Sequence, residues 1–222
     1  MIVRMLKARH TLDDLTEVGI DEAGRGCLWG PLVAAAVEWA EEDKWTEEIR
    51  EISAGIKDSK KLSAKRRALM ETAIKKHATQ WSIGRVEATE IDAKGMTRAN
   101  RLAFQRALDG LEKQPGRVVI DGILPLNTGI LEVCEAHGDQ LYLSIAAASI
   151  LAKEGRDRMV AEACAADPAL DTRYGLLKSK GYGTLIHRTA VKEYGMHAEH
   201  RKLFLRKLLG LDHTVHEEYM IS

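Results

Sequence analysis

The chain has 222 residues, of which 45% are hydrophobic, so it can bury the core of one α/β domain and is not disordered throughout. Lys and Arg together number 33, as do Asp and Glu, so the formal net charge is zero. The longest apolar run, 32–37, is far shorter than the roughly 18 residues that a membrane helix needs. The N-terminus has neither an extended apolar stretch nor a small-residue cleavage site, so we expect no signal peptide, no membrane partner and a cytoplasmic location.

The three cysteines, Cys27, Cys134 and Cys164, are odd in number and form no C-x-x-C pair. This pattern fits neither a disulfide scaffold nor a zinc ribbon, and we expect reduced thiols.

The zero net charge hides a gradient along the chain. Residues 38–51 hold seven acids against two bases, 57–76 hold eight bases against two acids, and 173–207 hold nine bases against two acids. Two basic segments around a carboxylate-rich centre can attract a polyanion to one face, which favours nucleic acid as a partner. Solvated helix faces are the alternative interpretation of each segment alone.

Hydrophobic patterning and capping residues predict the elements. In chain order we expect strands at 16–21 and 29–39, a helix from the N-cap Ser63 to about His77, and a strand at 81–88. A helix then runs from a capping box at 89–92 towards Leu111, followed by a strand at 117–120, a fifth strand at 141–145, and helices at 146–166, 184–194 and 200–209. This order predicts an α/β fold in which helices flank a mixed central sheet of about five strands. We expect a catalytic domain at 1–175 and, at 176–222, a helical segment that packs beside it and contributes substrate contacts.

Acidic residues follow the predicted β-runs. Asp21 and Glu22 end the first run, Asp121 follows the run at 117–120, and Asp139 precedes the Ala-rich helix. Carboxylates at strand ends can meet at one edge of a sheet, and carboxylate oxygens are preferred ligands of Mg²⁺. Four of them would balance two divalent ions about 4 Å apart, as in two-metal phosphodiester hydrolysis. Each acid is also common in ordinary turns.

Asp21 and Glu22 are adjacent, and adjacent residues of a strand point to opposite faces. We therefore expect the first strand to end at Asp21, with Gly24 and Gly26 allowing the chain to turn there so that both acids reach metal.

The motif at 19–31, G-I-D-E-A-G-R-G-C-L-W-G-P, resembles the opening motif of the ribonuclease HII family, part of the type 2 RNase H class. D-S-K-K-L-S at 58–63, Asp121-Gly122, Gly138-Asp139 with S-I-A-A-A-S-I-L-A-K at 144–153, Arg156-Asp157 and K-G-Y-G-T at 180–184 resemble further motifs of that family, in the family's order. The matches span residue 19 to about 204.

The resemblance implies an RNase H-like fold and endonucleolytic cleavage of RNA/DNA hybrids and of duplex DNA that contains embedded ribonucleotides. It implies that Asp21, Glu22, Asp121 and Asp139 hold two Mg²⁺ or Mn²⁺ ions. It further implies hydrolysis on the 5′ side of a ribonucleotide, which leaves a 5′-phosphate and a 3′-hydroxyl, with a role in ribonucleotide excision repair.

By the same resemblance, Gly24, Arg25, Gly26 and Tyr182 recognise the 2′-hydroxyl, the group that distinguishes RNA from DNA at a single nucleotide. Ser59, Lys60 and Lys61 resemble phosphate contacts, although a solvated turn before a helix is an equal alternative. Lys153 and Asp157 have the i, i+4 spacing of a structural ion pair.

The chain departs from the family pattern in three places that bear on substrate contacts. Leu203 stands where the family has Ser, Lys178-Ser179-Lys180 stands where a second His or Asn is commoner, and 95–100 is unusual. The tail at 211–222 shows no clear sliding-clamp motif, and we expect a monomer.

Two alternatives remain. The related ribonuclease HIII carries an extra N-terminal domain, and we expect that domain to be absent because 20 residues precede Asp21. A nucleic-acid-binding protein that has lost catalysis is disfavoured because all four candidate acids are present.

Overall fold

The computed structural model describes residues 5–210, in which five strands form one mixed sheet in the order β3-β2-β1-β4-β5. They are β1 (Glu17–Ala23), β2 (Leu32–Glu38), β3 (Gln80–Val86), β4 (Arg117–Asp121) and β5 (Leu131–Glu135). β1 pairs antiparallel with β2 and parallel with β4, so it is the strand at which the sheet changes from antiparallel to parallel pairing. The α/β class and the mixed five-stranded sheet expected from the sequence are confirmed.

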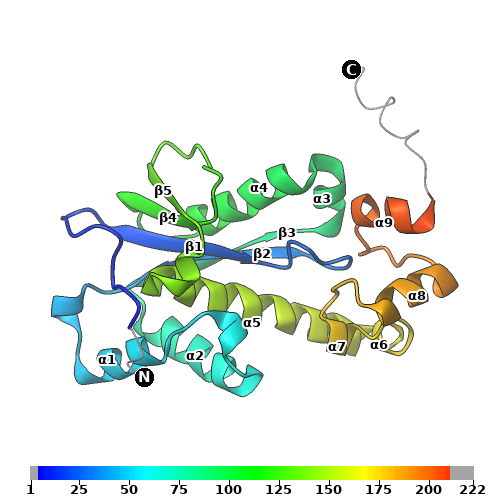
Figure 1. Ribbon diagram of the computed structural model, residues 1–222, viewed down its shortest axis with the longest axis horizontal. Helices are drawn as coiled ribbons and strands as arrows, with labels where there is room; N and C mark the ends of the chain where they lie inside the picture. The colour runs from blue at the N-terminus through cyan, green and yellow to red at the C-terminus, as the bar shows by residue number, and fades with distance from the viewer. Residues whose placement is uncertain (1–4, 211–222) are drawn as a thin grey trace.

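Helices cover both faces of this sheet (Figure 1). They are α1 (Glu47–Gly55), α2 (Ala64–His77), α3 (Ala88–Lys94), α4 (Met96–Asp109), α5 (Leu143–Ala166), α6 (Ala169–Tyr174), α7 (Leu176–Ser179), α8 (Leu185–Tyr194) and α9 (Lys202–Leu209), with 3-10 turns at Glu42–Lys44, Ser59–Lys61 and Gly138–Gln140. α3 and α4 lie on one face, α5 and α2 on the other, and α6 to α9 gather at one end of the molecule (Figure 1).

Side-chain alternation along the strands divides the core into two layers. Val18 and Ile20 of β1 pack with Phe104 and its neighbours on α4, whereas Ala35 and Val37 of β2 pack with α5. Because successive strand residues point to opposite faces, this alternation also decides which helix each polar residue further along β1 will meet.

The predicted strand at 141–145 is wrong, because Leu143 begins α5 and the fifth strand is β5. Both Leu143 and Ile145 are fully buried, as is most of the first half of α5. A short run that is apolar all round is compatible with a buried strand or a buried helix, so periodicity alone could not decide between them.

The predicted helix from 89 towards Leu111 is two helices, since Gly95 with φ 75° separates α3 from α4. The capping box is also shifted: the side chain of Glu87 caps α3, and the Glu90 carboxylate accepts from the Glu87 N–H at 3.1 Å. The N-cap Ser63 of α2 is confirmed. The helix expected at 184–194 is α8, whose N-cap is Thr184. The sequence did not predict α1, α6, α7 or β5.

One apolar cluster joins the last helices to α5 and to the segment between β1 and β2. The cluster contains Trp29, Val160 of α5, Tyr174 of α6, Leu176 of α7 and Leu205 of α9. Apolar packing therefore continues across position 175. The division into a catalytic domain and a C-terminal helical segment stays a prediction. No helix in the described residues is both long and apolar enough to cross a membrane.

Candidate active site

Three of the four predicted acids lie where β1 and β4 run side by side. Ile20 of β1 pairs with Ile120 of β4, so Asp21 and Asp121 are the next residues along two parallel neighbouring strands. Both acids, together with Glu22, border a cavity of about 230 Å³. The sheet therefore brings together carboxylates that are about one hundred residues apart in the sequence.

The expectation that β1 ends at Asp21 is wrong. β1 continues to Ala23, which still pairs with Val33 of β2. Asp21 lies on the face covered by α5, near Ser149, and Glu22 lies on the face covered by α4, near Asn100. The two acids reach the same cavity from opposite faces of the strand, so no break is needed.

The fourth acid, Asp139, lies in the 3-10 turn between β5 and α5 and is buried. The turn is tied to β4 because the N–H of Gly138 donates to Oδ1 of Asp121 at 2.7 Å. Asp139 does not line the cavity, but it is near enough to Asp121 and Asp58 for their negative charges to raise the pKa of its carboxyl group.

Electrostatics at this edge disfavour ionised carboxylates in the absence of a cation. Burial raises the pKa of Asp21 well above its usual value, and the charges of Glu22 and Asp121 raise it further. Burial also raises the pKa of Glu22, against the attraction of Arg25, and burial together with Asp121 raises that of Asp139. A buried cluster of like charges is stabilised when a positive ion enters it.

The carboxylate oxygens suit a hard cation such as Mg²⁺, which keeps part of its water shell and needs few protein ligands. No group of three or more His, Cys, Asp or Glu side chains among residues 5–210 is arranged as a ready-made metal cage. The donor set fits a divalent ion by its chemistry and charge, and it is open rather than closed.

Most of the other predicted site residues line the same cavity. Gly24, Arg25, Gly26, Ser59, Lys60 and Tyr182 border it together with Asp21, Glu22 and Asp121. Lys61 does not: its ammonium group lies 3.7 Å from Oδ2 of Asp58 and is largely exposed.

Two further residues of α5 line the cavity without having been expected there from the sequence, Ser149 and Lys153. Ser149 is a polar residue within an apolar, Ala-rich run, a signal that could have been used. Its hydroxyl lies 3.0 Å from that of Ser59, which joins α5 to the segment that carries Lys60. Lys153 makes the predicted ion pair with Asp157, at 2.5 Å.

Tyr182 faces the 24–26 turn across a short backbone bridge. Cys27 and Tyr182 pair as isolated antiparallel residues, and the N–H of Leu28 donates to Gly181 O at 2.8 Å. The Tyr182 side chain is 42% exposed, so its ring is available at the cavity. Burial of part of the ring raises the pKa of its phenol, which is therefore a hydrogen-bond donor at neutral pH.

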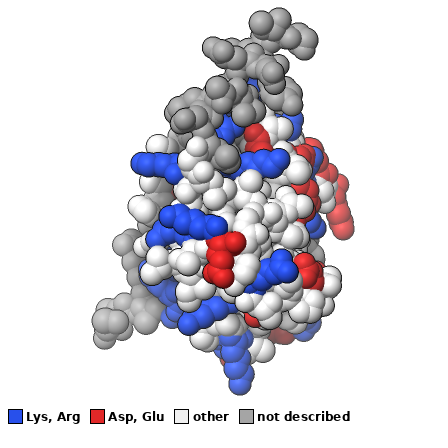
Figure 2. All heavy atoms as spheres, turned by 90° about the vertical axis from the view of Figure 1, so that its right-hand side faces the viewer, with Lys and Arg blue, Asp and Glu red and all other residues white. Residues whose placement is uncertain are grey.

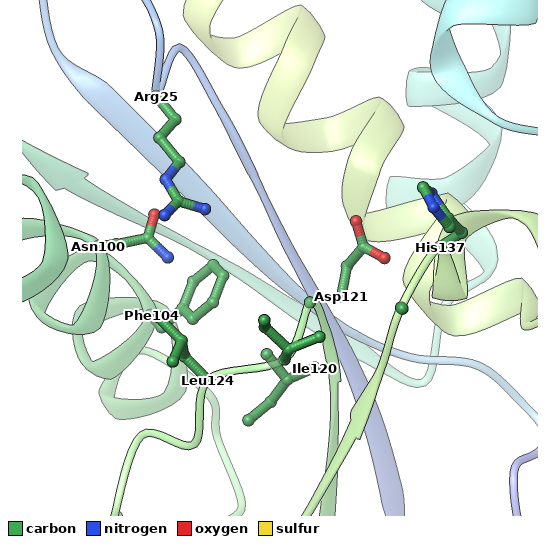
Figure 3. Close-up of a pocket in the computed structure, with 10 residues that line it drawn as sticks. Arg25, Asn100, Phe104, Ile120, Asp121, Leu124 and His137 are labelled. Atoms are coloured by element: carbon green, nitrogen blue, oxygen red, sulfur yellow. The ribbon is translucent and has the colours of Figure 1, made fainter.

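A second cavity of about 370 Å³ adjoins the first on the α4 side. Figure 3 shows Arg25 and Asn100 pointing towards each other at one end, Asp121 and His137 at the other, and Phe104, Ile120 and Leu124 between them. Arg25 and Asp121 border both cavities, so the acidic edge is open on two sides.

The fold is that of the type 2 RNase H class. The ribonuclease H2 from Pyrococcus horikoshii OT3 superposes with a TM-score of 0.70 at 27% identity, covering 88% of this chain and 97% of that one. The RNase HII in a PCNA complex from Archaeoglobus fulgidus superposes with a TM-score of 0.68 at 29% identity, covering 84% and 94%.

Sequence comparison identifies the family within this class. The sequence model described as ribonuclease HII matches residues 18–207. The ribonuclease HII of Synechococcus sp. (strain CC9902) is 44% identical over 197 residues, covering 86% of this chain and 93% of that protein. The chain belongs to the ribonuclease HII family and is a ribonuclease H endonuclease that acts on RNA/DNA.

Proposed function

We propose that the enzyme hydrolyses the phosphodiester bond on the 5′ side of a ribonucleotide, in RNA/DNA hybrids and in duplex DNA with embedded ribonucleotides. The products would be a 5′-phosphate and a 3′-hydroxyl. The observation that carries this proposal is that one cavity is bordered by Asp21, Glu22 and Asp121 as well as by the 24–26 turn and Tyr182. A single nucleotide in that cavity would meet the carboxylates and the sugar-facing groups together.

We propose that Asp21, Glu22, Asp121 and Asp139 hold two Mg²⁺ or Mn²⁺ ions. Bound ions of this kind supply an activated water and stabilise the leaving oxygen. The raised pKa values of Asp21, Glu22 and Asp139 support the assignment, because burial and mutual repulsion make the ionised carboxylates unfavourable and a bound cation would relieve that repulsion. The hydrogen bond from Gly138 orients the Asp121 carboxylate and keeps the Asp139 turn beside it.

Ribose recognition would use backbone and phenol groups. The N–H groups of the 24–26 turn can approach a sugar closely because Gly24 and Gly26 have no side chain. Tyr182 can pack its ring on the sugar and donate its O–H to the 2′-hydroxyl, the group by which a protein distinguishes RNA from DNA.

Phosphate contacts would come from Ser59 and Lys60, which border the cavity, and from Lys61 outside it. Figure 2 looks onto the end where α7, α8 and α9 lie, and Lys and Arg side chains are spread over this face with a few acids among them. Such a surface would attract the backbone of the duplex beyond the cleavage site.

The test is a DNA duplex that contains one ribonucleotide, incubated with Mg²⁺, with the cut position mapped on a sequencing gel. We expect a single cut 5′ of the ribonucleotide and no cut in the all-DNA duplex. Binding without cleavage would support a non-catalytic nucleic-acid-binding protein instead, and cleavage restricted to long hybrids would reject the proposed recognition of a single ribonucleotide.

A Tyr182→Phe variant tests the phenol in the same assay. It keeps the ring and removes the O–H, so we expect slower cutting at a single ribonucleotide. An unchanged rate would reject the role of the hydroxyl.

The monomeric state stays a prediction. The tail at 211–222, in which we found no sliding-clamp motif, lies outside the described residues, and we propose no clamp partner.

A further inference from the structure

Two arginine side chains lie buried beneath the 24–26 turn. Arg156 of α5 is 1% exposed, and Arg201, which immediately precedes α9, is 0% exposed. Every hydrogen bond that their guanidinium groups donate within the described residues goes to a backbone carbonyl oxygen. Burial of a charge without a carboxylate partner costs stability, and these hydrogen bonds to carbonyl groups offset part of that cost.

Arg201 holds the carbonyl groups of the turn. Its Nη1 donates to Gly24 O at 2.7 Å and to Arg25 O at 3.2 Å, and its Nε donates to Gly30 O at 2.9 Å. The carbonyl oxygens of two consecutive residues therefore point inward, towards one buried guanidinium group.

This contact decides where the following N–H groups point. In a trans peptide the C=O of one residue and the N–H of the next point in opposite directions, and none of the described peptides is cis. With the carbonyls of Gly24 and Arg25 turned inward, the N–H groups of Arg25 and Gly26 point away from the guanidinium. Neither N–H donates to an acceptor among the described residues, and both residues border the candidate active-site cavity.

Arg156 ties the turn region to the segment that carries Tyr182. It donates to Trp29 O at 2.9 Å and to Pro31 O at 3.0 Å on one side, and to Lys180 O at 2.7 Å on the other. Its guanidinium carbon is also 5.9 Å from the centre of the Tyr182 ring. The spacing between the turn and Tyr182 therefore depends on this side chain.

Arginine suits this task for a geometric reason. Its planar guanidinium presents five donors in fixed directions and no acceptor, whereas the ammonium of lysine is a point charge on a flexible stem. Lysine would keep the charge and most of the volume, but it could not hold three carbonyl groups in three directions.

We propose that Arg201 and Arg156 are positioning residues for ribose recognition, which fix the outward N–H groups of Arg25 and Gly26 and the place of Tyr182 without touching the substrate. The inference rests on the proposed role of the 24–26 turn and Tyr182. It goes further by assigning the enzyme's selectivity for a ribonucleotide to two buried side chains.

The test compares the affinity for a DNA duplex with one ribonucleotide against the affinity for the same duplex made of DNA only, by fluorescence anisotropy in EDTA. We expect Arg201→Lys to reduce the ratio of the two affinities by about tenfold, the scale of one well-placed hydrogen bond. The affinity for the all-DNA duplex should stay within about twofold of wild type, because phosphate contacts dominate it. Arg156→Lys should lower the ratio in the same way.

The matched control is Arg158→Lys, the same substitution one half-turn further along α5. Arg158 makes an ordinary ion pair with Glu71 at 2.9 Å, away from the turn, so its variant should keep the wild-type ratio. A merely structural role for Arg201 would lower the fraction of folded protein and the signal amplitude, but not the ratio. An Arg201→Lys protein that folds and keeps the wild-type ratio would overturn the inference.

If the lysine variants fail to fold, amide hydrogen exchange of the wild-type protein tests whether the Arg25 and Gly26 N–H groups contact the ribonucleotide. We expect the Arg25 and Gly26 amides to exchange more slowly on binding the ribonucleotide duplex than on binding the all-DNA duplex. Equal exchange in an enzyme that still cuts at the single ribonucleotide would reject this inference and leave the proposed function standing. A wild type with no preference for the ribonucleotide would reject the proposed function itself.

Discussion

The Nε2 atoms of His187 and His200 lie 2.9 Å apart in the interior of the C-terminal helices, and the groups around them determine which one carries the proton. Nδ1 of His200 accepts from the His197 N–H at 2.8 Å, so the proton of His200 is on Nε2. Nδ1 of His187 lies 3.0 Å from Tyr182 O, which can only accept, so Nε2 of His187 is the acceptor. Both rings are neutral. A second proton on either ring would occupy a nitrogen that already accepts a hydrogen bond, and would therefore be repelled by the donor N–H.

The histidine pair predicts a loss of stability in mild acid. Burial lowers the pKa of His200 from 6.5 to about 3 and also lowers that of His187. The unfolded chain takes up a proton below about pH 6.5 while folded His200 stays neutral until about pH 3, so stability falls as the pH drops through this window. Between pH 7 and pH 5, the free energy of unfolding measured with urea should fall by about 2 kcal/mol because of His200.

His200→Asn isolates this effect. Its side-chain oxygen can still accept from His197, but the residue no longer titrates, so the difference in unfolding free energy between pH 7 and pH 5 should shrink by about 2 kcal/mol. An undiminished difference would show that His200 is not buried in its neutral form.

Gly24 and Gly26 should respond differently to the same substitution. Gly24 has φ 91°, and a β-carbon there would overlap the Nε of Arg156, whereas a β-carbon at Gly26 would meet nothing within 4 Å. Gly24→Ala should therefore destabilise the fold by at least the roughly 1–3 kcal/mol of a strained backbone position. Gly26→Ala should stay within about 1 kcal/mol of wild type. Thermal unfolding of the two variants side by side provides the comparison, and equal melting temperatures would contradict the close packing of Gly24 against Arg156.

Asp121→Asn should abolish cleavage while sparing duplex binding. The amide oxygen of Asn can still accept from the Gly138 N–H, so the fold is kept, but the negative charge is lost. Loss of several kcal/mol of metal-assisted stabilisation corresponds to a fall of about 1000-fold in kcat. Asp109→Asn is the control, because Asp109 is an exposed acid at the end of α4 that accepts only from Gln105 among the described residues. Near-full Mg²⁺-dependent activity of Asp121→Asn would disprove the metal assignment.

Asp21→Asn should raise stability in EDTA at pH 8 and weaken the response to Mg²⁺. The pKa of Asp21 is raised in the folded protein, so ionising this carboxyl group costs folding free energy. The free energy of unfolding therefore falls as the pH rises from 3.8, the pKa in the unfolded chain, through the raised pKa in the folded protein. Asn removes that charge and keeps an oxygen for the Glu22 N–H. Melting curves with and without Mg²⁺ check both expectations: a lower melting temperature of the variant in EDTA, or an equal gain from Mg²⁺, would contradict them.

The sequence by itself determined the family, the class of fold and the approximate place of the candidate acids. These follow from local patterns: β-branched residues precede Asp21 and Asp121, Ser63 caps a helix, and the motifs occur in the family's order. Local patterns are reliable where the energy depends on near neighbours in the chain.

Only the tertiary structure decided how those residues meet. It showed that Asp21 and Glu22 reach one cavity from opposite faces of an unbroken strand, that 143–145 is helix, and that Lys61 turns to Asp58. It also brought Arg201 to the carbonyls of Gly24 and Arg25, more than 170 positions earlier. Such contacts depend on which helix packs on which face of the sheet, a choice made by the summed burial of the whole core and invisible to the spacing of a motif.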